Sequence, residues 1–106
     1  PDLFSAANSG VIFAGGVITG ATGANLKTNN CTVSRTGTGK YTVTMATPAA
    51  DTNFTLSITP SNPSGTMPII GEDTTVVRTT TVFGIQCIAI GVGFYDPAKF
   101  NFTVVQ

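Results

Sequence analysis

The sequence predicts an all-β fold, an antiparallel β-sandwich of jelly-roll-like type, on three observations. Thr fills 19 of the 106 positions, beside 12 Gly and 6 Pro. β-branched Thr favours pleated strands, whereas Gly and Pro are typical of turns. Polar and apolar residues alternate with a period of two in several segments, which turn-forming residues separate. The length suits one domain, 1–106, with residues 1–9 as an N-terminal arm.

Seven segments are expected to form strands. In chain order these are residues 10–20, 31–36, 40–47, 53–59, 74–81, 82–94 and 100–106. The alternation is clearest where Tyr41, Val43 and Met45 share one face and threonines the other. Glycines at positions 15 and 16 interrupt the first segment, which predicts a bulge or bend there. We expect loops at 60–68 and at 21–30, the latter with a short extended piece.

The segment 82–94 differs from the others because both of its faces are apolar. A strand of this kind is covered on both sides. Two arrangements would cover it: a central position in the core of one chain, or a threefold contact between identical chains. We expect a homotrimer, with Ile85, Cys87, Ile88 and Ile90 as the candidate interface.

The segment 35–48, RTGTGKYTVTMATP, has two competing interpretations: a phosphate-binding loop and a hairpin turn. A phosphate-binding loop requires a first glycine at position 34, a hydroxyl after the lysine and a helix thereafter. Those positions hold Ser34 and Tyr41, and a strand pattern follows. We therefore predict a hairpin turn in which Gly37 and Gly39 supply positive φ angles.

Composition excludes several classes of function. Charged residues make up 9% of the chain and the net charge is zero, which excludes a nucleic-acid binder and an anionic-membrane binder. No apolar run is long enough for membrane insertion. The first residue is Pro1, which suggests an excised or processed product.

Catalytic and metal-binding chemistry also lack the residues they need. The chain has no His, so a hydroxyl nucleophile has no imidazole base and a zinc site is excluded. Glu72 and Asp73 are adjacent and would face opposite sides of a strand. We expect no enzyme activity, no metal and no cofactor. Cys31 and Cys87 are either a disulfide or two buried thiols, and the second is favoured.

Two segments share a set of residues with a known family. These are Arg35, Gly37, Gly39, Tyr41, Val43, Thr47, Pro48 and Phe54, followed by Asp96, Pro97, Phe100, Phe102 and Val104. This pattern resembles a small β-domain at the carboxyl ends of bacteriophage tail fibres and in surface fibres of large viruses. Met45 stands where that pattern has Phe, a substitution that cores tolerate. The resemblance covers about half the chain and leaves residues 60–82 unmatched.

The resemblance implies a trimeric fibre head at the virion surface that attaches to a host receptor, either a glycan or a protein. It supplies no catalytic residues. We expect the loops 60–68, 71–74 and 94–98 to bind the receptor, with an exposed aromatic for stacking. The candidate ligand-binding residues are Asn62, Ser64, Thr66, Asp73, Tyr95 and Asp96.

Two other functions are compatible with the sequence. One is a structural module that trimerises or caps a fibre or capsid without touching a receptor. The other is a carbohydrate-binding module of a secreted enzyme. Such modules normally use exposed Trp or several Tyr, whereas this chain has no Trp and two Tyr.

Overall fold

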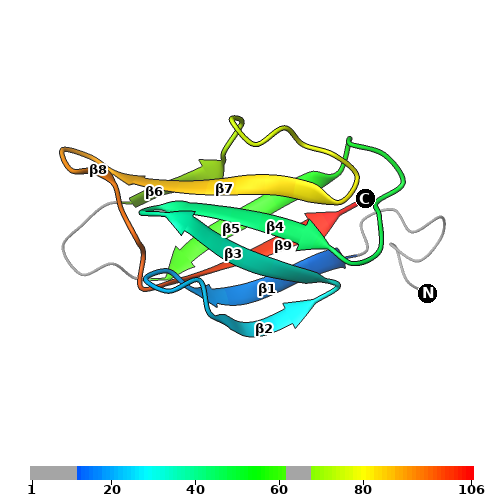
Figure 1. The fold of residues 1–106 in the computed structure, drawn as a ribbon, viewed down its shortest axis with the longest axis horizontal. Coiled ribbons are helices and arrows are strands. Elements are labelled where there is room, and N and C mark those ends of the chain that lie inside the picture. The colour runs from blue at the N-terminus through cyan, green and yellow to red at the C-terminus, as the bar shows by residue number, and fades with distance from the viewer. Residues whose placement is uncertain (1–11, 62–67) are drawn as a thin grey trace, which may run out of the picture.

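The computed structural model describes residues 12–61 and 68–106, and in these ranges it contains nine strands and no helix. The strands are β1 (Ile12–Thr19), β2 (Asn25–Asn29), β3 (Cys31–Gly37), β4 (Lys40–Met45), β5 (Thr55–Ser61), β6 (Pro68–Glu72), β7 (Val82–Ala89), β8 (Gly93–Phe94) and β9 (Lys99–Val105). They form two sheets that face each other (Figure 1). The all-β prediction is therefore confirmed for the described residues.

All strand pairs in the two sheets are antiparallel. Sheet A has the order β2-β1-β9-β5, and sheet B has the order β3-β4-β7-β6 with β8 beside β7. Ile12 at the start of β1 pairs with Val105 at the end of β9. The chain thus enters and leaves the sandwich at one end, and the β7–β8 hairpin lies at the opposite end (Figure 1).

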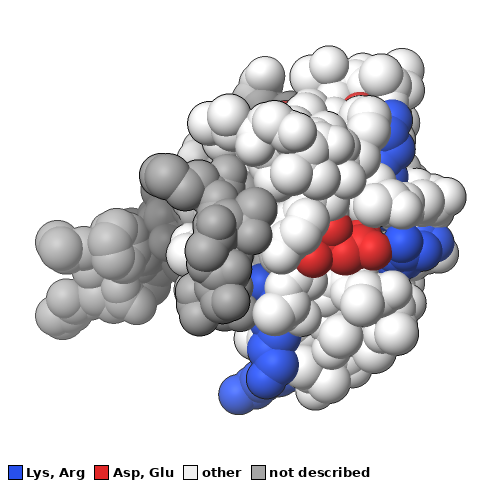
Figure 2. Space-filling view, turned by 90° about the vertical axis from the view of Figure 1, so that its left-hand side faces the viewer, with Lys and Arg blue, Asp and Glu red and all other residues white. Residues whose placement is uncertain are grey.

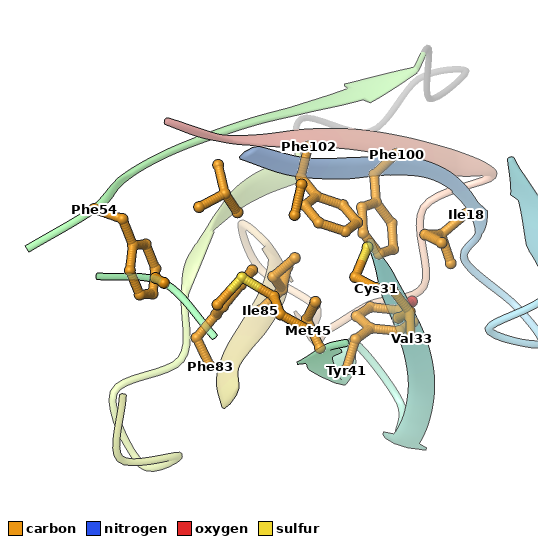
Figure 3. Close-up of a cluster of buried hydrophobic side chains, with 14 residues drawn as sticks. Ile18, Cys31, Val33, Tyr41, Met45, Phe54, Phe83, Ile85, Phe100 and Phe102 are labelled. Carbon is orange, nitrogen blue, oxygen red and sulfur yellow. The ribbon is translucent and has the colours of Figure 1, made fainter. Parts of the chain in front are cut away.

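The core consists of the alternating apolar side chains of both sheets. Phe100 and Phe102 of β9 point toward sheet B, where they approach Tyr41 and Phe83 (Figure 3). The ring centroids are 4.8 Å apart for Tyr41 and Phe100 and 6.1 Å apart for Phe83 and Phe102. Both distances lie in the range of favourable aromatic pairs. Asn101 and Thr103 alternate with these phenylalanines along β9 and therefore lie on the outer face of sheet A, which sheet B does not cover.

The fold of one chain covers one of the two apolar faces of the segment 82–94. Ile85 and Cys87 are fully buried between the sheets, so their side chains cannot contact a second chain. Their assignment to a trimer interface is wrong for this reason. Ile88 is half-buried and Ile90 is exposed, so these two remain on the surface. Cys87 and Cys31 are both buried free thiols, as the favoured interpretation had it.

The structure departs from the predicted segments in several places. Residues 74–81 form a loop instead of the expected strand. Conversely, β2 is a strand within the expected loop, although all its residues are exposed. The irregularities in β1 lie between Ile12 and Ala14 and between Val17 and Ile18, not at the two glycines.

The glycine-rich segment is a hairpin turn, as predicted. β3 and β4 pair on either side of it, with Gly37 opposite Lys40. Of the two glycines, only Gly39 has a positive φ, of 68°. A Cβ at Gly39 would also lie 2.5 Å from the carbonyl oxygen of Cys87, so glycine is required there for space as well as for conformation.

Candidate functional site

The outer face of sheet A carries an open trough of about 600 Å³. It is lined by residues from all four strands of the sheet, and its volume lies within the range typical of small-molecule sites. We call it the sheet A trough. Its lining residues are Ile12, Gly15, Gly16, Val17, Lys27, Thr28, Asn29, Ser57, Thr59, Asn101, Phe102 and Thr103.

The register of sheet A places the outward side chains of the trough in two transverse rows. The first row is Asn29, Gly15, Thr103 and Ser57, and the second is Lys27, Val17, Asn101 and Thr59. Adjacent strands lie about 4.8 Å apart and the rows are two residues apart along each strand. The rows therefore form a platform about 14 Å by 7 Å.

The floor of the trough is low at Gly15, because this residue adds no side chain to the first row. A Cβ at Gly15 would lie 2.6 Å from the carbonyl oxygen of Phe102, and one at Gly16 would lie 2.6 Å from that of Lys27. Both neighbours are backbone atoms, so neither can move aside easily. The close approach of β1 to β9 and β2 requires these glycines, and the hollow is its consequence.

The polar groups of the trough are free to bind a ligand. Among residues 12–61 and 68–106, no hydrogen bond or ion pair involves the side chains of Lys27, Asn29 or Asn101. All three are exposed, as are Ser57 and Thr59. The trough thus offers hydroxyl, amide and ammonium groups on rigid strands, beside the apolar surface of Val17 and Ile12.

Asp96, a residue that the sequence suggested as a ligand, instead joins the two sheets. Arg35 donates to its carboxylate through Nη2 at 2.7 Å and Nε at 3.3 Å, and the Gly39 amide donates to Oδ1 at 2.7 Å. The Tyr41 hydroxyl lies 2.9 Å from Oδ1 and 2.8 Å from the carbonyl oxygen of Gly20. We call this cluster the Asp96 tie.

The electrostatics of the Asp96 tie favour an ionised carboxylate. Burial alone would raise the pKa of Asp96, but the hydrogen bonds from Arg35, Gly39 and Tyr41 hold it below its ordinary value. Burial, followed by the hydrogen bond to Asp96, raises the pKa of Tyr41. The hydrogen bond to Asp96 also raises the pKa of Arg35. The arrangement is that of a structural ion pair whose groups already have partners.

Asp73, a second expected ligand, is also occupied by its own chain. Its side chain is buried, and Oδ1 accepts hydrogen bonds from the hydroxyl of Thr75 at 2.6 Å and from its amide at 3.0 Å. The hydroxyl bond is the main reason that the pKa of Asp73 is lowered. Lys40 lies 3.9 Å from Oδ2. Burial therefore contradicts its role as an accessible ligand.

Of the remaining predicted site residues, only Tyr95 lies among the described residues. Tyr95 is half-buried, and its amide donates to the carbonyl oxygen of Cys87. Its aromatic neighbour Phe94 is the more exposed of the two. Asn62, Ser64 and Thr66 lie outside the described residues.

The surface charges of the described chain are mostly neutralised by one another. Figure 2 looks onto the end that carries the β3–β4 hairpin and β8, and shows acidic atoms directly beside basic atoms. The ion pairs are Arg35–Asp96, Lys40–Asp73 and Arg78–Glu72. Lys27 takes part in none of them, which sets the trough apart electrostatically.

A second hollow, of about 300 Å³, lies between the edge strands β5 and β6. Arg78 closes it on one side. This residue donates to Glu72 at 2.7 and 3.0 Å and to the carbonyl oxygens of Thr52 and Phe54, whose ring it also covers at 4.0 Å. These contacts fix the loop between β6 and β7 to the sandwich, so Arg78 has a structural role.

Comparisons with known proteins identify no relative: no family model matches the chain, and no curated protein or solved structure matches it either. In the part of the chain that the structure describes, no group of three or more metal-ligating side chains is assembled. No helix among these residues could cross a membrane.

Proposed function

We propose that the chain is the head domain of a viral fibre, exposed on the virion, that attaches to a host-cell glycan through the sheet A trough. The observation that carries this proposal is the set of free hydroxyl, amide and ammonium groups arrayed over the trough. The resemblance to fibre-head sequences, carried by residues such as Arg35, Tyr41 and Asp96, supports the viral context.

The trough combines hydroxyl, amide and ammonium groups with a larger area of apolar surface, a mixture that can serve both the hydroxyls and the ring faces of a sugar. Hydroxyl and amide side chains can exchange hydrogen bonds with sugar hydroxyls, because each can donate and accept. Val17 adds apolar surface that can pack against the C–H groups of a pyranose ring. Because strands hold these groups in place before binding, little conformational entropy is lost in the complex.

The binding surface proposed here is a sheet face, whereas the sequence predicted loops. Asp73 and Asp96 satisfy groups of their own chain, so using them for a ligand would break existing hydrogen bonds. The trough residues lose only bound water. The sheet face therefore has the lower cost of binding.

Two matched substitutions test the location of the site. Ser57 on β5 and Ser34 on β3 are both exposed serines on edge strands, but only Ser57 lines the trough. We expect Ser57→Tyr to weaken binding to an immobilised oligosaccharide panel by at least about tenfold, a loss of about 1.4 kcal/mol. Ser34→Tyr should bind like the wild type. Equal binding by both variants would place the site elsewhere, and a wild-type chain that binds no oligosaccharide would refute glycan attachment.

A second candidate function is a structural module that trimerises or caps a fibre without receptor contact. It is favoured by exposed apolar residues at the end with the β7–β8 hairpin, namely Ile69, Ile90, Val92 and Phe94. This end lies opposite the paired residues Ile12 and Val105. Contact between copies there would cover the apolar surface.

Light scattering tests association independently of ligand binding. We expect a homotrimer of about three times the 10.8 kDa mass of the chain. Ile90→Ser should dissociate it, whereas Leu26→Ser, a change at another exposed apolar residue, should not. A mass near that of one chain for the wild-type protein would contradict the trimer and leave the trough proposal intact.

A further inference from the structure

We infer that the ligand of the sheet A trough is an acidic oligosaccharide, in which a sugar carboxylate pairs with Lys27 at the β2 side of the sheet. This inference rests on the proposed glycan-binding function and specifies the class of glycan. It follows from the distribution of charge along the two rows, from the open shape of the site and from the position of the site on a sheet face.

Lys27 is the one charged residue that lines the trough in the part of the chain that the structure describes. No carboxylate belongs to the lining, so a cationic ligand would find no partner and an anionic one finds an ammonium group. Elsewhere on the described surface, basic groups such as Arg35 and Arg78 already hold carboxylates of their own chain. The trough therefore selects for negative charge.

The rows also fix the direction in which such a ligand would lie. Lys27 stands on the edge strand β2, and the second row continues through Val17 to Asn101 and Thr59 on the far side. A charged sugar over β2 would place the remaining sugars of the oligosaccharide over β1, β9 and β5. Over β1 the ligand meets Val17, and over β9 and β5 it meets neutral hydroxyl and amide groups, which suit the hydroxyls of neighbouring sugars.

An acidic peptide fits this surface less well. Extended peptides gain most of their affinity by pairing with an exposed sheet edge. The trough lies across the face of the sheet, where the backbone groups of β1 and β9 are already paired with their neighbours. The trough is open, so it would not enclose a large side chain of a peptide. Recognition must come from groups that project from the ligand, as sugar hydroxyls do.

The test uses a panel of oligosaccharides in matched forms. It contains neutral oligosaccharides, carboxylate-bearing ones built on hexuronic and sialic acids, the methyl esters of the same acids, sulfated neutral oligosaccharides and oligoglutamate. Esterification removes the charge and keeps the sugar ring. We expect the wild-type chain to bind one or more carboxylate sugars and to bind the corresponding methyl esters about tenfold more weakly, the effect of one charged hydrogen bond.

Variants of the lysine complete the design. Lys27→Gln should reduce binding of the acid to the level of its ester, and Lys27→Arg should retain the preference. Lys40→Gln is the control, because it removes the same charge from sheet B, where Lys40 lies over Phe94. Its binding should equal that of the wild type. Added salt should weaken binding of the acid and leave that of the ester nearly unchanged.

Several other outcomes would overturn the inference. Binding restricted to neutral or sulfated sugars, or an acid preference that survives Lys27→Gln, overturns this inference and leaves glycan attachment standing. Binding of oligoglutamate in place of sugars overturns it in favour of an acidic peptide. Binding of nothing in the panel overturns both this inference and the proposed function.

Discussion

The Asp96 tie and the sheet A trough both contain polar groups, which have hydrogen-bond partners within the chain in the tie and none among the described residues at Lys27 and Asn101 of the trough. In the tie, the carboxylate of Asp96 is matched by Arg35, by the Gly39 amide and by the Tyr41 hydroxyl. In the trough, Lys27 and Asn101 have no partner among the described residues. Polar groups that satisfy one another stabilise the fold, and polar groups that remain free are available for recognition. The tie therefore serves the fold, whereas the polar groups of the trough are left available to a ligand.

The largest expected effect is at Gly20, which contributes its carbonyl oxygen to the tie. A Cβ at this position would lie 1.7 Å from the carbonyl oxygen of Pro97, so the backbone would have to move. We expect Gly20→Ala to lower the free energy of unfolding by about 3 kcal/mol or more. Gly37→Ala is the control because no atom lies within 4 Å of its Cβ, and it should cost less than about 1 kcal/mol. Urea unfolding measures both, and equal costs would contradict the packing at Gly20.

A smaller loss of stability is expected when the charge of the tie is removed. Asp96→Asn keeps the size of the side chain but weakens the hydrogen bonds from Arg35 and Gly39. Since Asp96 is mostly buried, we expect a loss of about 2 to 3 kcal/mol in urea unfolding at neutral pH. Oligosaccharide binding by the folded variant should be unchanged. A stable variant that no longer binds would restore Asp96 as a ligand residue.

The lowered pKa of Asp96 also makes the free energy of unfolding depend on pH. The pKa of Asp96 in the folded chain is below its ordinary value of 3.8, so the unfolded chain binds more protons between the two values. The stability that the tie contributes is fully present above that ordinary value and is lost as the pH falls toward the folded value. Asp96→Asn should therefore flatten the acid limb of the stability curve below about pH 5. Some dependence should remain, because the pKa of Asp73 is lowered too.

The smallest effects on stability are expected in the trough. Lys27→Gln, Asn101→Ala and Ser57→Ala remove exposed side chains that have no partner among the described residues, so each should change the free energy of unfolding by less than about 0.5 kcal/mol. The first two should nevertheless weaken oligosaccharide binding. Thermal unfolding and binding measured on the same samples check this. A loss of more than 1 kcal/mol in stability would mean that the trough residues serve the fold.

Regular alternation made much of the sandwich predictable. Tyr41, Val43 and Met45 alternate with threonines, and all three are buried in the core. Where both faces are apolar, as at Ile85 and Ile88, alternation cannot say which face points inward, and the proposed interface was therefore partly wrong. The strand β2 carries no such pattern and is held by pairing with β1 and by bonds between Asn25 and Val33.

The candidate site could not be predicted from the sequence because it depends on strand order. Lys27, Asn101 and Ser57 are far apart in the chain and line one surface only when β9 lies between β1 and β5. Asp73, a loop carboxylate expected to bind the ligand, is buried, and its burial could not be predicted from the sequence either. Its hydrogen-bond partner Thr75 is local, but its burial is set by the packing of the whole sandwich.

Backbone amide shifts, measured by NMR while the chain is titrated with its strongest oligosaccharide ligand, would locate the binding surface. If the trough binds the sugar, the largest shifts should fall on Gly15, Val17, Asn101 and Thr103, and the amides of Gly39 and Asp73 should hardly move. Shifts concentrated on the loop around Tyr95 and Asp96, with the outer face of sheet A unchanged, would contradict the assignment of the trough as the binding site.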